Sequence, residues 1–228
     1  ALPISGSGSG TGSGNVGTGS GAGSWTISLA GTGTSNGGSW PFGGGTREQV
    51  RASEVALAIL LAESSDKRFW EPMDGPFAQL PVSIDSHEGQ LIVDAFLATF
   101  GPKVVPTAFD RIFVVQSIHR IQCPDRELIF NTTCKNFESR GRSAKVAMLF
   151  HGTRKDNVDS IALNNLQVCG GGGNGQMHGE GTYLTTSGAY AGQTRYTNDD
   201  ANGLRHVFLR SEEHTSELQS HSDLVCRL

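Results

Sequence analysis

The sequence predicts an α+β fold for the part of the chain between residues 68 and 210. Three observations support this class. Residues 87–100 place apolar side chains at helical spacing, residues 109–121 (FDRIFVVQSIHRI) have the β-branched content of a strand, and residues 146–150 form a short apolar run. Helix-like and strand-like segments of this kind, mixed along one chain, indicate a single α+β domain.

The segment before this domain divides into two parts. Residues 1–46 contain SGSGSGTGSGNVGTGSGAGS and are expected to be a disordered linker, because such a Gly/Ser-rich stretch cannot bury enough apolar surface to fold. Residues 47–67 are expected to be a helical connector, rich in strong helix formers. This helix either precedes the domain or is its first packing element. Its side chains available for burial are those of Val50, Leu57, Leu60 and Leu61.

Within the domain, the first helix and the first strand each carry apolar residues that are expected to be buried in the core. The helix at 87–100 is expected to bury Leu91, Ala95, Phe96 and Phe100. The strand at 109–121 is expected to bury Ile112, Val114, Ile118 and Ile121. A second helix is expected over 125–138, since Pro124 is tolerated in a first turn.

The later elements surround a candidate site. The apolar run from Val146 to Phe150 is expected to be a strand that ends at His151. Residues 155–164 and 187–197 look like helices, and a further strand is expected to begin at Val207–Leu209.

Residues 211–228 are expected to be foreign to the domain. Residues 210–220 read RSEEHTSELQS, which is the translation of a common sequencing-adapter oligonucleotide. Without this tail, of net charge −3, a chain of net charge −4 leaves a domain of −1. The chain also begins with Ala1 rather than Met, so an N-terminal portion is expected to be missing.

Charge and cysteine usage narrow the class of protein. A near-neutral domain without a Lys/Arg cluster gives no electrostatic case for nucleic-acid or membrane binding, and no apolar run is long enough for a membrane span. Outside the tail, three irregularly spaced cysteines argue against a disulfide framework and against a CxxC-type zinc site. They are Cys123, Cys134 and Cys169. A reduced intracellular compartment and no metal site are therefore expected.

Three motifs carry candidate chemistry. They are Leu149-Phe150-His151-Gly152-Thr153, then Gly179-Glu180-Gly181-Thr182-Tyr183, and Tyr196 thirteen residues after Tyr183. A glycine lets the backbone approach a ligand, and its N–H and C=O can pair with a carboxamide. A tyrosine ring is a flat stacking surface, and imidazole and hydroxyl groups suit ribose hydroxyls.

Each motif also has a purely structural explanation. The histidine could be a hydrogen-bonded structural group, the glycines of the second motif could belong to turns, and Tyr190 and Tyr196 could pack on a core. The joint order and spacing favour the functional interpretation.

In this order and spacing, the motifs resemble the NAD-binding core of the poly(ADP-ribose) polymerase (PARP) family. The likeness covers roughly Phe69 to Leu209, includes IHRIQCPDRELIFNTTCKNF and VAMLFHGTR, and is most like the mono-ADP-ribosylating members. It implies the ADP-ribosyltransferase fold, with split antiparallel sheets and flanking helices. It also implies that the domain is incomplete at its C-terminus, since the family's third catalytic position lies on a later strand. The sheets would then expose unpaired edges, and we expect aggregation or poor NAD binding.

The resemblance implies an enzyme that transfers ADP-ribose from NAD, its co-substrate, to a protein acceptor in the nucleus or cytoplasm. By matching position, His151 contacts a ribose, Gly152 holds the nicotinamide amide, Tyr183 lines the pocket and Tyr196 stacks on the ring. His151 and Tyr183 are the candidate catalytic residues. The remaining candidate NAD-binding residues are Thr153, Gly181 and Tyr190.

One departure from the family pattern keeps an alternative open. The family commonly has Ala-x-Tyr-Ser where this chain has Gly188-Ala189-Tyr190-Ala191, so a hydroxyl that bonds the nicotinamide amide is absent. Losing one neutral hydrogen bond costs about 1 kcal/mol, unless Ser187 or Thr194 compensates. The alternatives are an inactive PARP-like module that binds NAD or a partner, and a Gly-rich scaffold protein with a folded interaction domain.

Overall fold

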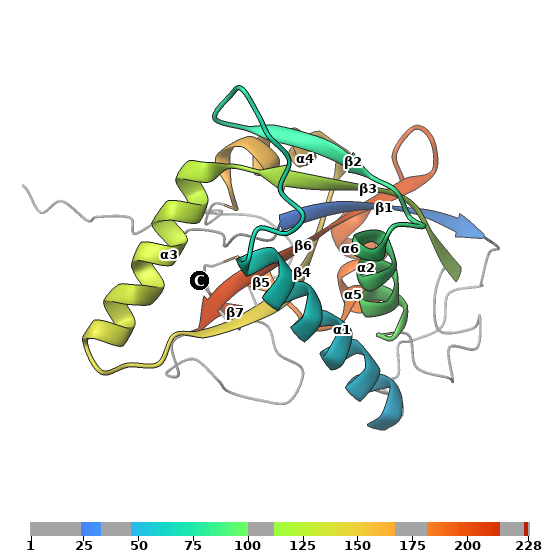
Figure 1. The fold of residues 1–228 in the computed structure, drawn as a ribbon. Helices are drawn as coiled ribbons and strands as arrows, with labels where there is room; N and C mark the ends of the chain where they lie inside the picture. The colour runs from blue at the N-terminus through green and yellow to red at the C-terminus, as the bar shows by residue number, and fades with distance from the viewer. Residues whose placement is uncertain (1–23, 33–46, 100–111, 167–181, 215–225, 228) are drawn as a thin grey trace, which may run out of the picture.

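The architecture is a five-stranded antiparallel sheet with helices on both faces and a two-stranded sheet beside it (Figure 1). The computed structural model describes residues 24–32, 47–99, 112–166, 182–214 and 226–227. In spatial order the larger sheet consists of β2 (Ala78–Val82), β3 (Ile112–Gln122), β1 (Ser24–Thr32), β6 (Leu204–His214) and β4 (Lys145–Thr153). The smaller sheet pairs β5 (Tyr183–Leu184) with β7 (Cys226–Arg227). The predicted α+β class with split antiparallel sheets is confirmed.

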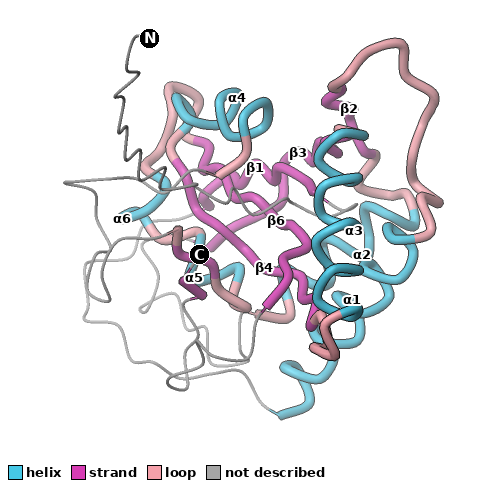
Figure 2. The backbone as a smooth tube through the Cα atoms, turned by 90° about the vertical axis from the view of Figure 1, so that its left-hand side faces the viewer, coloured by secondary structure: helices cyan, strands magenta, loops and turns pink. Residues whose placement is uncertain are grey.

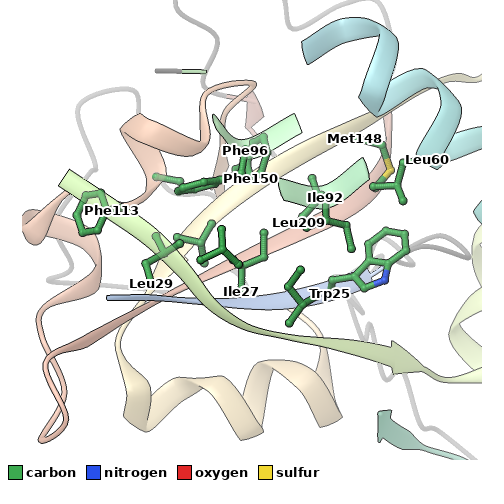
Figure 3. Packing of buried hydrophobic residues seen from close by; sticks show 14 of the residues in the cluster. Trp25, Ile27, Leu29, Leu60, Ile92, Phe96, Phe113, Met148, Phe150 and Leu209 are labelled. Carbon is green, nitrogen blue, oxygen red and sulfur yellow. The ribbon is translucent and has the colours of Figure 1, made fainter. Parts of the chain in front are cut away.

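Helices cover the two faces of the larger sheet unequally. On one face lie α1 (Arg47–Ser65), α2 (His87–Leu97) and the short α5 (Gly188–Ala191), and on the other lies α4 (Lys155–Asn164) (Figures 1 and 2). The remaining helices are α3 (Pro124–Ser139) and the short α6 (Thr194–Thr197). The first face carries the main core, where Ile92, Phe96 and Phe150 are fully buried (Figure 3).

Strand β1 overturns part of the expected linker. The prediction of disorder over residues 1–46 is wrong for Ser24–Thr32, which pair with β3 on one side and β6 on the other. Apolar residues at every second position explain this, because a strand directs alternate side chains to the same face. Trp25, Ile27 and Leu29 are at most 1% exposed and point into the main core (Figure 3). Residues 1–23 and 33–46 lie outside the described part of the chain.

Helix α1 belongs to the domain and is no separate connector. It packs on α2 and β4, and Leu60 is fully buried in the main core beside partly buried Leu57 and Leu61. Of the two alternatives left open by the sequence, the structure therefore selects the first packing element. The side chain of Val50 lies outside the described residues.

A register change in β3 corrects one expected core residue. The sequence predicts that Val114 is buried, yet its side chain is 49% exposed. The pairing of β3 with β1 shifts between Ser28 and Leu29, which leaves Gln116 without a partner in β1. This bulge reverses the alternation, so Phe113 and Val115 face the core before it while Ile118 does so after it.

The helices otherwise begin and end close to the predicted residues. Ser86 caps α2 by accepting the N–H of Gly89, and Pro124 lies in the first turn of α3. The face of α2 that packs on the core carries Ile92, Ala95 and Phe96, with Leu91 partly buried. Phe100 lies outside the described residues.

Two later predictions need correction. The single helix expected at 187–197 is two short helices, α5 and α6, separated by Gly192 and Gln193. Strand β6 continues past Arg210 to His214, and this extension pairs with Lys145–Met148 of β4. Ser211–His214 are therefore part of the larger sheet, and Cys226–Arg227 form β7 of the smaller one, so the prediction that residues 211–228 are foreign to the domain is wrong for these residues.

Two further observations concern the described residues only. None of their helices is both long enough and apolar enough to cross a membrane. Cys123 and Cys134 are free thiols.

Candidate functional site

The candidate site lies where β4 ends against the segment that contains β5. One edge of β4 pairs with β6, and on its other edge Phe150 forms a bridge with Thr185. The Phe150 N–H donates to the Thr185 carbonyl at 2.7 Å, and the Thr185 N–H donates back at 2.9 Å. This bridge brings Tyr183 beside His151, although 32 residues separate them in the sequence.

His151 is held by a backbone hydrogen bond. Its Nδ1 lies 2.9 Å from the carbonyl oxygen of Tyr183, so the Nδ1–H tautomer donates to that carbonyl. Burial lowers the pKa of the imidazole, the positive charge of Arg210 lowers it further, and the bond to Tyr183 opposes both effects. The ring is therefore neutral near pH 7, and its Nε2 lone pair can accept a hydrogen bond from a ligand hydroxyl.

Gly152 presents its backbone polar groups at the edge of β4. Successive residues of a strand point their N–H and C=O groups to opposite edges, and those of Phe150 point toward Thr185. The groups of Gly152, two residues later, therefore point to the same edge. Between β4 and residues 182–185 the pairing is an isolated bridge at Phe150 and Thr185 and does not continue as a ladder to Gly152.

The missing side chain of Gly152 lets two helices approach β4. A Cβ at this position would lie 1.9 Å from the carbonyl oxygen of Ala191 and 3.1 Å from Cγ2 of Thr197. Only glycine permits this contact, which packs the end of α5 and the end of α6 onto the strand. Ala191, where the family commonly has serine, is buried here.

Tyr190 and Tyr196 form a pair. Their ring centroids are 5.3 Å apart with the planes tilted by 45°, and the Tyr196 hydroxyl donates to the Tyr190 hydroxyl at 2.6 Å. Burial and this hydrogen bond raise the pKa of Tyr190 to about 12. The guanidinium of Arg195 lies 5.7 Å from the Tyr196 ring centroid. Tyr190 therefore fixes the orientation of Tyr196.

The other predicted site residues are distributed as follows. Thr153 ends β4 opposite His206 and is 4% exposed. Ser187 caps α5 through its side-chain oxygen, which accepts the N–H of Tyr190 at 3.2 Å. Gly181 lies outside the described residues.

Arg205, which sequence reasoning missed, holds the segment between α5 and β6. Its Nε donates to Asp199 at 2.8 Å and its Nη1 to the carbonyl of Gly192 at 3.2 Å, and the side chain is 3% exposed. Its guanidinium also lies 4.9 Å from the ring centroid of Phe113. The one signal in the sequence is an arginine two residues before Val207, at the same alternation as the core residues Val207 and Leu209.

Comparison with known proteins agrees with this geometry. A family model described as the poly(ADP-ribose) polymerase catalytic domain matches residues 86–219, which include β3, β4, β6 and all the candidate site residues. The human protein mono-ADP-ribosyltransferase PARP14 is 31% identical over 97 residues, which are 42% of this chain and 5% of that relative's length. Since the family match covers more than half of the 228 residues, the chain belongs to the PARP catalytic-domain family.

Proposed function

We propose that the chain carries the NAD site of an ADP-ribosyltransferase, which transfers ADP-ribose from NAD to a protein acceptor and releases nicotinamide. Membership of the family supports this activity. The observation that carries the proposal is the edge of β4, where the backbone groups of Gly152 lie next to a neutral His151 and to Tyr183.

Each group at this edge suits one part of NAD. The N–H and C=O of Gly152 match the C=O and NH₂ of the nicotinamide carboxamide, so one residue can fix the plane of the ring. The Nε2 of His151 accepts a hydrogen bond from a ribose hydroxyl, because its Nδ1–H is already used by the Tyr183 carbonyl. The rings of Tyr183 and Tyr196 supply flat surfaces for the pyridine, and Tyr190 orients Tyr196.

These contacts account for the reaction. The bond between the ribose carbon and the nicotinamide nitrogen breaks, nicotinamide leaves with the bonding electron pair, and the ribose becomes oxocarbenium-like. A nucleophile of the acceptor protein then forms the new bond to that carbon and loses its proton. Fixing both ends of the breaking bond lowers the barrier by orientation, and contacts that strengthen as charge develops lower it further.

The test incubates labelled NAD with a parent protein that carries the complete catalytic domain, and with its His151→Ala and Tyr183→Ala variants. Leu128→Ala is the matched control, because Leu128 lies on α3 and is 67% exposed. We expect label on the parent and on the control, and about tenfold less on the two site variants, since a lost transition-state contact of about 1.4 kcal/mol slows the reaction tenfold. Equal labelling of all four proteins would reject the site assignment.

A second candidate function is an NAD-binding module without transfer. The observation that favours it is the methyl group of Ala191, which supplies no hydroxyl for the nicotinamide amide, while Ser187 already caps α5. Calorimetry that detects NAD binding, with no label transferred, would select this module. Ala191→Ser is expected to strengthen NAD binding about fivefold, since a neutral hydrogen bond contributes about 1 kcal/mol.

A further inference from the structure

The face of the larger sheet that α4 covers contains a polar hollow (Figure 2). A small apolar cluster holds α4 there, in which Ile121 and Phe208 of the sheet pack against Val158 and Ala162 of the helix. Beside this cluster lies a hollow of about 340 Å³, and of the eight side chains that line it only that of Val158 is apolar. Its volume lies at the lower end of the range for small-molecule sites.

The floor of the hollow consists of hydroxyl side chains on the central strand. Thr26 and Ser28 of β1 are 4% and 9% exposed, and both line the hollow. The side-chain amide of Gln79 donates to the Thr26 hydroxyl at 3.4 Å, and the Ser28 hydroxyl lies 3.2 Å from Nδ1 of His206. A hydroxyl has one donor and two acceptor positions, so each of these contacts leaves capacity for a ligand.

The imidazole of His206 is fixed in place behind this floor. Its Nε2 lies 3.0 Å from one carboxylate oxygen of Asp200. The other oxygen of Asp200 accepts the N–H groups of Asn202 at 2.8 Å and of Leu204 at 2.9 Å. This chain of hydrogen bonds runs from the backbone to the Ser28 hydroxyl, so the floor is ordered before a ligand arrives. Such preorganisation reduces the entropy that binding must overcome.

The rim of the hollow carries two opposite charges. Lys155 and Asp159 lie one turn apart on α4, and both are exposed. Burial and the charge of Lys155 lower the pKa of His119, which lines the hollow from β3, so this ring is neutral near pH 7. An ammonium group binds phosphate as a point charge, and a carboxylate accepts hydrogen bonds from hydroxyls. The rim therefore offers one partner for an anion and another for hydroxyl groups.

We propose that this hollow is a second ligand site, which binds a small sugar phosphate with its phosphate on Lys155 and its hydroxyls on Asp159 and the floor. Inorganic phosphate would use Lys155 alone and would be repelled by Asp159, whereas a neutral sugar would leave the ammonium of Lys155 without a partner. The site is separate from the edge of β4. None of the side chains that line the hollow is a candidate NAD-binding residue, and Thr153, which pairs opposite His206, is not among them.

The test titrates ribose 5-phosphate into a parent protein that carries the complete catalytic domain and follows binding by calorimetry. This probe joins one phosphate to several hydroxyls in a compact molecule. We expect saturable binding that weakens about tenfold or more in Lys155→Ala and in Asp159→Ala, since each variant loses a hydrogen bond to a charged group. Lys135→Ala is the matched control, because Lys135 is an exposed lysine of α3 that does not line the hollow. This control should bind the probe as the parent does.

The results that overturn the proposal are distinct. If ribose 5-phosphate does not saturate the parent at millimolar concentration, then the hollow holds only solvent. Equal affinities of Lys155→Ala and Lys135→Ala would place the probe elsewhere on the protein. Ribose or inorganic phosphate that binds as tightly as ribose 5-phosphate would show that the two ends of the hollow do not act together. Lys155→Ala should bind NAD as the parent does, and weaker NAD binding by this variant would show that the hollow is part of the NAD site.

Discussion

Replacing Gly152 with alanine is the sharpest test of the packing that builds the candidate site. The new Cβ would lie 1.9 Å from the Ala191 oxygen, whereas real Cβ contacts stay above 3.0 Å, so the oxygen must move by at least 1.1 Å. That oxygen belongs to the backbone of α5, and Gly152 belongs to a paired strand, so neither can yield by a side-chain rotation. The end of α5 must therefore leave β4.

The loss of folding stability follows from this geometry. Overpacking a core typically costs 1–3 kcal/mol, and a clash between two backbones belongs at the upper end, about 3 kcal/mol. For a domain of this size, that lowers the melting temperature by about 6–12 °C. Because α5 and α6 carry Tyr190 and Tyr196, we also expect weaker NAD binding.

Gly192→Ala is the matched control. It lies between the same two short helices, has a φ of −76°, and an added Cβ would meet its nearest atoms at 3.4 Å, an ordinary contact. We expect no loss of stability, or a gain of about 0.5 kcal/mol from the stiffer unfolded chain. Urea unfolding of both variants and calorimetric NAD titration provide the measurements. A Gly152→Ala protein with the urea midpoint of Gly192→Ala would refute the reasoning.

Three further predictions concern groups that the structure partly or fully buries. Tyr190→Phe and Tyr196→Phe should each lower the free energy of unfolding by about 1 kcal/mol. The double variant should lose no more than either single variant, because both substitutions remove the same hydrogen bond, and a double-mutant cycle by urea unfolding measures this. The lowered pKa of His151 means that the unfolded state binds a proton at this histidine more tightly than the folded state does. The free energy of unfolding should therefore fall as the pH drops below 6.5, and it should fall less steeply in His151→Gln. Arg210→Leu should lower the free energy of unfolding by about 3–5 kcal/mol, because it leaves the buried carboxylate of Glu212 unpaired. Replacing both residues with leucine should leave the stability unchanged or raise it, and urea unfolding measures both variants.

Local patterns in the sequence predicted most of the helices. Residues 155–164 form a helix with the predicted bounds, and Pro124 marks the start of α3. These elements depend on nearest-neighbour propensity, which a single sequence displays.

The features that the sequence did not reveal depend on contacts between segments that lie far apart in the chain. The short apolar alternation around Ile27 lies inside a Gly/Ser-rich stretch, and it becomes a strand because β3 and β6 offer it two edges. The exposure of Val114 depends on a bulge in the same pairing. Backbone breaks such as that at Gly192 and buried cations such as Arg205 likewise depend on tertiary contacts.

The candidate site was partly predictable for the same reasons. The resemblance of the motifs to the PARP family indicated that His151 and Tyr183 belong together, and the structure joins them by a hydrogen bond. The role of Tyr190 in orienting Tyr196, and the direction of the backbone groups of Gly152, depend on three-dimensional pairing. Spacing does not reveal which edge of a strand a peptide group faces.

The most direct test of the central claim observes the backbone N–H of Gly152 itself. Labelling with ¹³C-carbonyl histidine and ¹⁵N-glycine selects the two His-Gly pairs of the chain, and His178→Gln removes the second of them. We predict that the remaining amide signal, that of Gly152, shifts when nicotinamide or NAD is added. If that signal stays in place while NAD binds, then the nicotinamide is held elsewhere and the assignment of this edge of β4 is contradicted.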